Sequence, residues 1–421
     1  MAKIAVLGYG TVGSGVVEVL ETNKDSITKR AGREIEVKSV LDLRDFPGDP
    51  IQEKIVHDVD VIINDPEIEV VVEVMGGVEP AFTFVKRALE AGKSVCTSNK
   101  ALVAAHGPEL LEMAKKRNLN FMFEASVGGG IPIIRPLKQS MTGNHITEIM
   151  GIVNGTTNYI LTKMTESGMD YAEALAKATE LGYAEADPTA DVEGYDAGRK
   201  IAIMASIAFN SRVTFADVYT EGITKISADD IKYAKEFGYV IKLLGVARNV
   251  DGQIEVKVHP MLIDENHPLA TVKDAFNAVF VHGDAMDDAM FMGRGAGEMP
   301  TASAVMGDII DVMRDIVCDC CGRIGCSCYK KLYVKKIEET KSKFFLRIKA
   351  KDKTGVLANI ASVLGNNDVS IAQVVQKRRS SGVAELVIIT DEVEEKNFND
   401  AMAIFEGMSV ISEIAGVIRV H

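Results

Sequence analysis

Apolar and polar residues in the first third of the chain follow a rhythm that is typical of parallel β-sheet proteins. Short apolar runs predict buried strands at 3–7, 34–41, 60–63, 68–75 and 94–97. Apolar residues at helical spacing predict helices at 11–20, 79–91 and 101–117. This alternation predicts a parallel sheet with helices on both faces, in which ligands gather at the carboxyl ends of the strands.

The pattern changes from residue 146 onward. Strands are predicted at 146–153, 240–250, 253–260, 278–281 and 289–293, and a helix at 301–314. Three helices are predicted between the first two of these strands, and the Thr side chains of NGTTN are expected to cap the first. This region therefore predicts a mostly antiparallel sheet covered by helices.

The last part, residues 343–421, reads as strand, helix, strand, strand, helix and strand. That order predicts an antiparallel sheet with both helices on one face, in a separate module. No charged cluster in it is typical of catalysis, so we interpret it as a binding or pairing unit.

The first strand leads directly into glycines with the spacing of a dinucleotide-binding turn. Gly8, Gly10 and Gly13 form G-x-G-x-x-G between this strand and an amphipathic helix. Such glycines permit a tight turn, close approach of the backbone to a pyrophosphate, and close packing of helix on strand. We therefore predict a Rossmann domain that binds NAD or NADP through Gly8, Gly10, Thr11, Val12 and Gly13.

The end of the second strand leaves the choice between NAD and NADP open. An acidic residue here binds the ribose 2′-hydroxyl of NAD, whereas an Arg accommodates the 2′-phosphate of NADP. The sequence has both, as Asp42 and Arg44. Further along, the loop 293–300, GRGAGEMP, precedes a helix and offers backbone N–H groups to a cofactor, with Gly297 as the candidate residue.

A stretch with three Asp and two Glu, residues 181–200, adjoins an apolar helix. Asp187 and Pro188 are typical of a helix start, and Asp196 and Lys200 then lie one turn apart on one face. One interpretation is a solvated ion pair. Because the residues after Lys200 are apolar, we favour a partly desolvated lysine that donates a proton to a carbonyl oxygen.

Lys100 follows the strand 94–97 at the start of a helix, where a cation opposes the helix dipole. It is either a surface lysine or the partner of an anion. Cys96, inside the strand, fits core packing better than a nucleophile, because no His is obviously placed to activate it.

Three consecutive glycines follow Glu124 and precede Ile131. The backbone carbonyls of the irregular turn and the carboxylate suit a hard cation. A plain glycine hinge between domains is an equal alternative.

Five cysteines lie close together, at Cys318, Cys320, Cys321, Cys326 and Cys328. Their spacing lacks the usual pairs of a zinc site. Zinc binding and redox cross-linking are kept as alternatives to an ordinary reduced linker.

Composition narrows the classes of partner. The net charge of −13 from 47 basic and 60 acidic residues argues against nucleic acid and against an anionic membrane surface. No apolar run reaches the roughly 18 residues that predict a membrane span, and the start of the chain shows no signal peptide. With six cysteines expected as thiols, we predict a cytoplasmic protein.

Several segments, taken in order, resemble homoserine dehydrogenase over roughly residues 1–330. They are 8–13, 97–100, 124–131, 154–159 and 182–200. The segment GYAEADPTADVEGYDAGRK is highly specific. Residues 343–421 resemble an ACT domain, a regulatory amino-acid-binding fold, with DKTGVL at 352–357 similar to its first ligand loop.

The resemblance implies NAD(P)-dependent interconversion of L-homoserine and L-aspartate 4-semialdehyde, on the route to threonine, methionine and isoleucine. It implies that Lys200 and Lys100 lie at the reacting oxygen, with Lys200 as acid/base, and that Asp191 helps to position the substrate. Glu185 and Asp196 are implied to hold the substrate.

The resemblance also implies ligands other than the substrate. Gly182 is implied at the cofactor, in addition to Lys100. Glu124 and the carbonyls of Val127, Gly129 and Ile131 match the family's sodium site. The segment VLDLRD departs from the family's usual valine-arginine-aspartate. An effector such as threonine at the ACT domain and a homodimer or homotetramer are also implied.

The predicted fold class is α/β with four segments. They are an N-terminal Rossmann NAD(P)-binding domain at 1–130, an α+β substrate-binding, catalytic and dimerisation domain at 131–317, a cysteine-rich linker at 318–342, and a C-terminal ferredoxin-like βαββαβ (ACT) domain at 343–421.

Two other functions fit the same patterns. One is a different NAD(P)-dependent dehydrogenase of a small amino acid or aldehyde, such as an enzyme that forms a thioester on Cys96. The other is a non-catalytic sensor of nucleotides and amino acids. The lysine and carboxylates at 181–200 favour an enzyme over a sensor, because a sensor needs no proton donor beside a hydride site.

Overall fold

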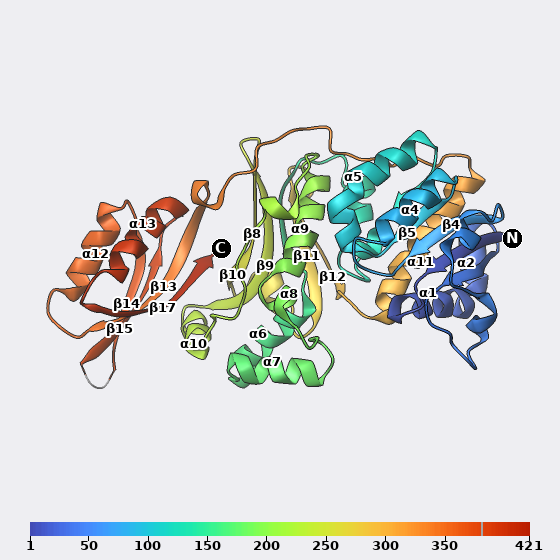
Figure 1. Cartoon of the computed structure of the whole chain (residues 1–421). Coiled ribbons are helices and arrows are strands. Elements are labelled where there is room, and N and C mark those ends of the chain that lie inside the picture. The colour runs from blue at the N-terminus through green and yellow to red at the C-terminus, as the bar shows by residue number, and fades with distance from the viewer. Residues whose placement is uncertain (380–381) are drawn as a thin grey trace. The chain divides into compact units, whose positions relative to one another are not determined.

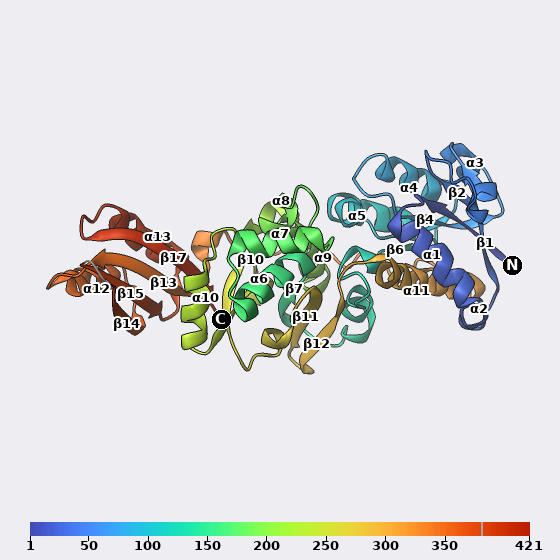
Figure 2. The same cartoon turned by 90° about the horizontal axis from the view of Figure 1, so that it is seen from below.

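The computed structural model describes residues 1–379 and 382–421. Its residues form two compact units. The first comprises 1–149, 199–215 and 277–331, and the second comprises 150–198, 216–276 and 332–421. Figures 1 and 2 show the elements of both units in two views.

A parallel six-stranded sheet in the order β3-β2-β1-β4-β5-β6 forms the centre of the first unit. The strands are β1 (Ala2–Leu7), β2 (Ile35–Leu41), β3 (Ile55–Val56), β4 (Ile68–Glu73), β5 (Ser94–Thr97) and β6 (Phe121–Met122). Every pairing in it is parallel. The predicted parallel sheet is confirmed, and its strand order places the glycine turn after the central strand β1.

Helices cover both faces of this sheet (Figure 2). They are α1 (Thr11–Thr22), α2 (Lys24–Ala31) and α11 (Glu298–Val317) on one face, and α4 (Ala81–Glu90) and α5 (Lys100–Lys116) on the other. The apolar side of α11, with Ala302 and Ile309, is buried in one core with Ile4 and Val6 of β1. Thus α11, which lies in the predicted domain 131–317, packs in the core of the nucleotide-binding unit.

The predicted strand at 60–63 is wrong, because these residues form a short helix, α3 (Val59–Ile63). The Asp58 carboxylate accepts a hydrogen bond from the Asp60 N–H at 2.9 Å and caps this turn. Val61 is 52% exposed while Ile62 and Ile63 are buried. A run of three apolar residues is too short for periodicity to separate strand from helix.

The first unit also contains β12 (Asp287–Arg294) and all of β11 (Phe276–Gly283) except Phe276, and these strands are neighbours in the order β12-β11-β7. The boundary between the units divides β7 (Ile146–Ile152). It also divides α9 (Tyr195–Ala208), so that Gly198 belongs to the second unit and Arg199 to the first.

In the second unit the strands follow the order β7-β9-β10-β17-β13-β15-β14. Their bounds are β9 (Tyr239–Val250), β10 (Gln253–Asp264), β13 (Lys341–Lys351), β14 (Ile371–Arg379), β15 (Val383–Thr390) and β17 (Ile411–Val420), with the short β8 (Tyr219–Thr220) on β10 and β16 (Val393–Glu394) on β13. The helices are α6 (Gly155–Ser167), α7 (Tyr171–Glu180), α8 (Thr189–Val192), α10 (Ala228–Glu236), α12 (Val356–Asn366) and α13 (Glu395–Glu406). The predicted strands of this part are confirmed, as are its predicted helices except for the one that begins at Asp187.

The single helix predicted from Asp187 is interrupted. The Asp187 carboxylate does accept the Thr189 N–H at 3.1 Å, but the helix that it starts, α8, ends at Val192. Gly194 then adopts a φ of +81°, and α9 begins at Tyr195. A residue with a side chain is strained at this φ, so the glycine separates the two helices.

The cap of α6 also differs from the prediction. Asn154 accepts the Thr157 N–H at 2.9 Å through its side-chain oxygen, so an Asn rather than a Thr caps this helix. Asn is among the strongest N-cap residues, and the predicted Thr157 lies inside the first turn.

The C-terminal βαββαβ order is confirmed, with β17-β13-β15-β14 as its sheet. Both helices pack into one core with these strands, and Phe344 stacks on Phe398 of α13 at 3.6 Å between ring centroids. This module also contacts the rest of the second unit. Strand β17 pairs in parallel with β10, and the His421 N–H donates to the Leu262 carbonyl at 2.9 Å.

The described part of the chain contains no helix that is long and apolar enough to cross a membrane.

Candidate active site

The glycine turn after β1 has the geometry expected of a dinucleotide-binding loop. Gly8 has a φ of +98°, and α1 begins at Thr11, directly after Gly10. A Cβ at Gly13 would collide with the Gly8 carbonyl oxygen, whereas a Cβ at Gly10 would meet open space. A cavity of about 690 Å³ opens at this turn and is lined in part by Gly8, Gly10, Asp42 and Arg44. The turn thus leaves room for a pyrophosphate at the N-terminus of α1.

Asp42 and Arg44 form one ion pair beside this turn. The Asp42 carboxylate accepts the Tyr9 N–H at 2.9 Å and the Arg44 Nε–H at 3.0 Å. Arg44 also donates to the Tyr9 carbonyl at 3.0 Å. The hydrogen bond from Arg44 lowers the pKa of Asp42 well below its usual range. The carboxylate is therefore engaged by the protein, while the Arg44 side chain is 62% exposed.

Three polar side chains hold the start of α5, where Lys100 lies. The buried Glu73 carboxylate accepts the Thr97 hydroxyl at 2.6 Å. Asn99 caps the helix by accepting the Leu102 N–H at 3.0 Å, and its amide donates to the Gly77 carbonyl. Lys100 itself is half-buried at the first position of α5. The sequence reasoning missed Glu73 and Asn99, although an Asn before a helix and an acid at a strand end are both recognisable signals.

Lys200 and Asp196 lie one turn apart on α9. Lys200 is 8% exposed and Asp196 is 3% exposed, so the alternative of a solvated ion pair is wrong. The expected burial of Lys200 is confirmed, because the residues that follow it on α9 are part of the core.

Asn154 joins two of the predicted acidic residues in the second unit. Its side-chain amide donates to Asp191 at 2.7 Å and to Asp196 at 3.0 Å. The same side chain caps α6, so α6 fixes the spacing of the two carboxylates. The sequence reasoning did not name Asn154 as a site residue, although it begins NGTTN directly after a strand. Glu185 lies nearby in the sequence but is exposed, and no hydrogen bond joins it to this group in the described chain.

The two other predicted glycines lie in different units. Gly297 is the N-cap of α11 and has a φ of +114°. The next residue, Glu298, accepts the Ser14 hydroxyl of α1 at 2.9 Å, so Gly297 lies near the start of the dinucleotide-binding helix. Gly182 has a φ of +73° in the exposed turn after α7 in the second unit.

Cys96 is fully buried in β5, and burial raises the pKa of its thiol well above the ordinary value. A reactive cysteine needs access and a stabilised thiolate. The structure therefore opposes the aldehyde-oxidising alternative that forms a thioester on Cys96.

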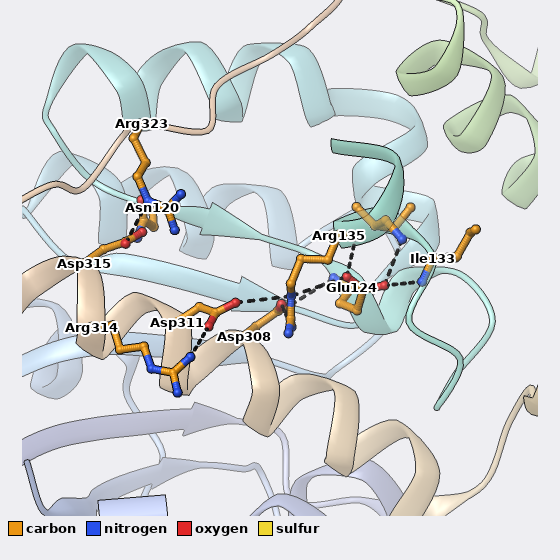
Figure 3. Close-up of polar contacts among 10 residues, drawn as sticks. Asn120, Glu124, Ile133, Arg135, Asp308, Asp311, Arg314, Asp315 and Arg323 are labelled. Carbon is orange, nitrogen blue, oxygen red and sulfur yellow. Dashed lines mark hydrogen bonds and ion pairs between the residues drawn. The ribbon is translucent and has the colours of Figure 1, made fainter. Parts of the chain in front are cut away.

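The Glu124 carboxylate is engaged by backbone donors (Figure 3). Its oxygens accept the N–H groups of Ile133 at 2.6 Å, Ile134 at 2.8 Å and Arg135 at 2.7 Å. Arg135 in turn donates to Asp308 of α11 at 2.7 Å, and burial raises the pKa of Asp308 to about 7. The Glu124 carboxylate thus stabilises the turn at residues 133–135. Binding of a cation here would therefore depend on the carbonyls of Val127, Gly129 and Ile131.

Comparison with known proteins agrees with this arrangement. Residues 132–310 match the homoserine dehydrogenase family, residues 8–124 match the homoserine dehydrogenase NAD binding domain, and residues 344–407 match the ACT domain. These spans follow the predicted domain order, although α11 packs with the nucleotide-binding unit.

Individual relatives match over most or all of the chain. The chain is 43% identical over 430 residues to homoserine dehydrogenase of Synechocystis sp., with 99% of each chain covered. The crystal structure of a homoserine dehydrogenase from Thiobacillus denitrificans superposes with a TM-score of 0.95 at 39% identity, covering 100% of this chain and 98% of that one. A hyperthermophilic archaeal homoserine dehydrogenase in complex with NADPH has a TM-score of 0.63 at 28% identity, covering 74% of this chain and 97% of that one. This chain therefore belongs to the homoserine dehydrogenase family, with an NAD-binding domain, a catalytic domain and a C-terminal ACT domain.

Proposed function

We propose that the protein interconverts L-homoserine and L-aspartate 4-semialdehyde with NAD or NADP. The observation that carries this proposal is the similarity to homoserine dehydrogenases over 99% of the chain. The test is the absorbance of the nicotinamide after homoserine and each cofactor are mixed with the full-length protein. Cofactor reduction that requires homoserine supports the proposal, and reduction only with another small alcohol or aldehyde contradicts it.

In the proposed chemistry, a lysine donates the proton that the substrate oxygen gains. Bound NAD(P) supplies the hydride acceptor or donor. When the aldehyde is reduced, its oxygen gains negative charge, which the Lys200 ammonium stabilises and then neutralises by giving up a proton. Lys100 is proposed as the second cation at this oxygen. Its place at the capped start of α5, held by Asn99 and Glu73, supports a fixed position.

The side chains proposed to contact the substrate are acidic. Carboxylates suit the substrate ammonium, and Asp196 and Glu185 are assigned to it, with Asp191 as a positioning residue. The hydrogen bonds from Asn154 to Asp191 and Asp196 support this assignment, because one amide that donates to two carboxyl groups keeps them at a fixed spacing.

We propose that NADP is the preferred cofactor and that Arg44 holds its 2′-phosphate. Asp42 accepts bonds from Tyr9 and Arg44, so it is not free for a ribose 2′-hydroxyl. The Arg44 guanidinium lies at the rim of the cofactor cavity.

Arg44→Ala is expected to raise KM for NADP by about tenfold or more, because a charge-assisted hydrogen bond to phosphate is lost. KM for NAD should change little. Steady-state kinetics with both cofactors measure this, and Arg30→Ala, an exposed change at the far end of α2, is the control. An equal rise for both cofactors contradicts the assignment.

We also propose a sodium ion beside Glu124, where the residues fit such an ion in part. Three backbone carbonyls, of Val127, Gly129 and Ile131, suit a hard cation, whereas the Glu124 carboxylate is already engaged. No catalytic step depends on this ion.

We also keep a cytoplasmic location and a homodimer or homotetramer as proposals. The free cysteines support the first, and the resemblance of the tail to ACT domains supports the second.

We propose further that the ACT domain binds an amino acid such as threonine and thereby lowers turnover. Its loop at 352–357 leads into α12 through Gly355, which has a φ of +86°. Turnover of the full-length protein is expected to fall as threonine rises, and Asp352→Ala should abolish this response without changing turnover in its absence. Asp400→Ala, an exposed change on α13, should respond like the wild type. If threonine changes no variant, another amino acid or no effector must be considered.

A further inference from the structure

A second cavity lies in the first unit between α5, α9 and the cysteine-rich segment. Its lining includes Val103 and Leu111 of α5, Ile203 of α9, Lys138, Arg212 and Cys328. Its volume is about 50 Å³. Because one water needs roughly 10–15 Å³, this space holds a molecule of only a few heavy atoms. It is distinct from the cofactor cavity, with which it shares no lining residue.

Lys138 carries an uncompensated charge at this cavity. Within the described residues no carboxylate lies at ion-pair distance from its ammonium. The Lys138 Nζ lies 5.3 Å from the centroid of the Phe123 ring. Burial lowers the pKa of Lys138. The closest acidic groups, Glu124 and Asp308, are held by backbone N–H groups and by Arg135 (Figure 3). An anion in the cavity would supply the missing partner.

Arg212 is the second cation of the cavity lining. Its guanidinium makes one long hydrogen bond, to the Ala105 carbonyl at 3.5 Å, and the part of the chain that the structure describes offers it no carboxylate. A guanidinium with free N–H groups matches the two oxygens of a carboxylate.

The remaining walls are neutral. Cys328 donates to the Ser206 carbonyl at 3.7 Å, and burial raises the pKa of its thiol to about 12, so no thiolate balances the cations. Val103, Leu111 and Ile203 make the rest of the surface apolar. The cavity therefore combines positive charge with hydrocarbon walls.

We propose that this cavity binds a short-chain carboxylate, with the carboxylate on Lys138 and Arg212 and the hydrocarbon chain against Val103 and Leu111. An inorganic anion would leave the apolar walls unused, whereas an alcohol or amide would leave the lysine unpaired. The volume limits the ligand to an acid of about the size of butyrate.

A ligand in this cavity is expected to affect the reaction, and this expectation rests on the function proposed above. Helix α5 begins with Lys100, and α9 carries Lys200. A ligand wedged between these two helices favours one spacing of the two lysines over others. Bound carboxylate should therefore change turnover without competing with the cofactor.

Binding is tested by calorimetry of the full-length protein with butyrate, butyramide, n-butylamine and inorganic phosphate. Butyrate should bind, and its affinity should fall by about tenfold or more in Lys138→Met, because a charge-assisted contact is lost. Lys177→Met, an exposed change on α7, should bind like the wild type. Val103→Phe, which fills the cavity and keeps the charge, should also abolish binding.

Unchanged butyrate binding in both Lys138→Met and Val103→Phe would overturn the site. Equal binding of butyramide would overturn the role of charge, and tighter binding of phosphate than butyrate would overturn the organic ligand. Calorimetry needs no turnover, so this test stands apart from the proposed reaction. Turnover that butyrate leaves unchanged in the wild type, despite measured binding, would overturn the coupling to the lysines.

Discussion

Replacing Lys200 with Ala is expected to lower kcat by about 10²–10⁴-fold, the usual cost of losing a general acid. The lysine is 8% exposed on α9, so its ammonium interacts with little competition from water. In the proposed mechanism its charge acts mainly on the oxygen that becomes negative in the transition state. The Kd for NAD(P) should therefore stay nearly unchanged.

The experiment compares Lys200→Ala and Lys200→Arg by steady-state kinetics and by cofactor titration. Arg keeps the positive charge but does not release a proton near neutral pH. If proton donation matters, Lys200→Arg should remain far below the wild type. Retention of more than about half of wild-type turnover by Lys200→Ala would remove Lys200 from the mechanism. Restoration of turnover by Arg would leave it as an electrostatic residue only.

The nucleotide-binding half of the molecule was readily predicted from the sequence because its signals are local. A glycine turn between an apolar strand and an amphipathic helix depends on neighbouring residues, and Gly8 and Gly13 adopt the roles that the spacing predicts. The failure at 60–63 has the opposite cause. One helical turn capped by Asp58 and one short apolar strand have the same composition, so periodicity does not separate them.

The missed parts of the candidate site depend on distant residues. Asn154 is recognisable as a helix cap, but its second role requires Asp191 and Asp196, far along the chain. Glu73 likewise acts through Thr97 on the next strand of the sheet. The pairing of β17 with β10 joins two strands whose separate patterns are complete without it. Sequence spacing describes each element, but it does not specify which elements meet.

The pairing of β17 with β10 changes how regulation by the ACT domain must be tested. Deletion of residues 330–421 would remove the neighbour of β10 and two buried ion networks together. Arg419 donates to Glu395 and to Glu221, and Arg347 of β13 donates to Asp230 of α10 at 2.8 Å. Loss of activity after truncation would therefore not separate regulation from stability. Point variants in the full-length chain are the better test.

Arg347→Met is expected to lower the free energy of unfolding by about 3–5 kcal/mol. Arg347 is 3% exposed and donates to Asp230, to Glu385 at 3.0 Å, and to the Ser227 hydroxyl at 2.9 Å. Both acidic partners are almost fully buried. Removing the guanidinium takes its positive charge and its hydrogen bonds away from two carboxylates inside the protein.

Lys349→Met is the matched control for this variant. It lies two residues further on the same strand, and its ion pair with Glu413, at 2.7 Å, is partly exposed to solvent. Such pairs contribute about 0–1 kcal/mol. Urea denaturation of the full-length protein, followed by circular dichroism, should separate the two variants by several kcal/mol. Similar losses for both would contradict a special role of burial.

The combined variant Arg347→Met/Glu385→Gln tests the physical cause. If the loss comes from buried negative charge that Arg347 no longer offsets, neutralising Glu385 should recover part of it, because Tyr233 still donates to this side chain at 2.6 Å. If the loss comes from the missing packing of the Arg347 side chain, the combined variant should be no more stable than Arg347→Met. A recovery of about 1 kcal/mol or more would place the cost in electrostatics. Because Arg347 links the first ACT strand to α10, that result would identify this buried charge cluster as a stabilising contact between these two elements.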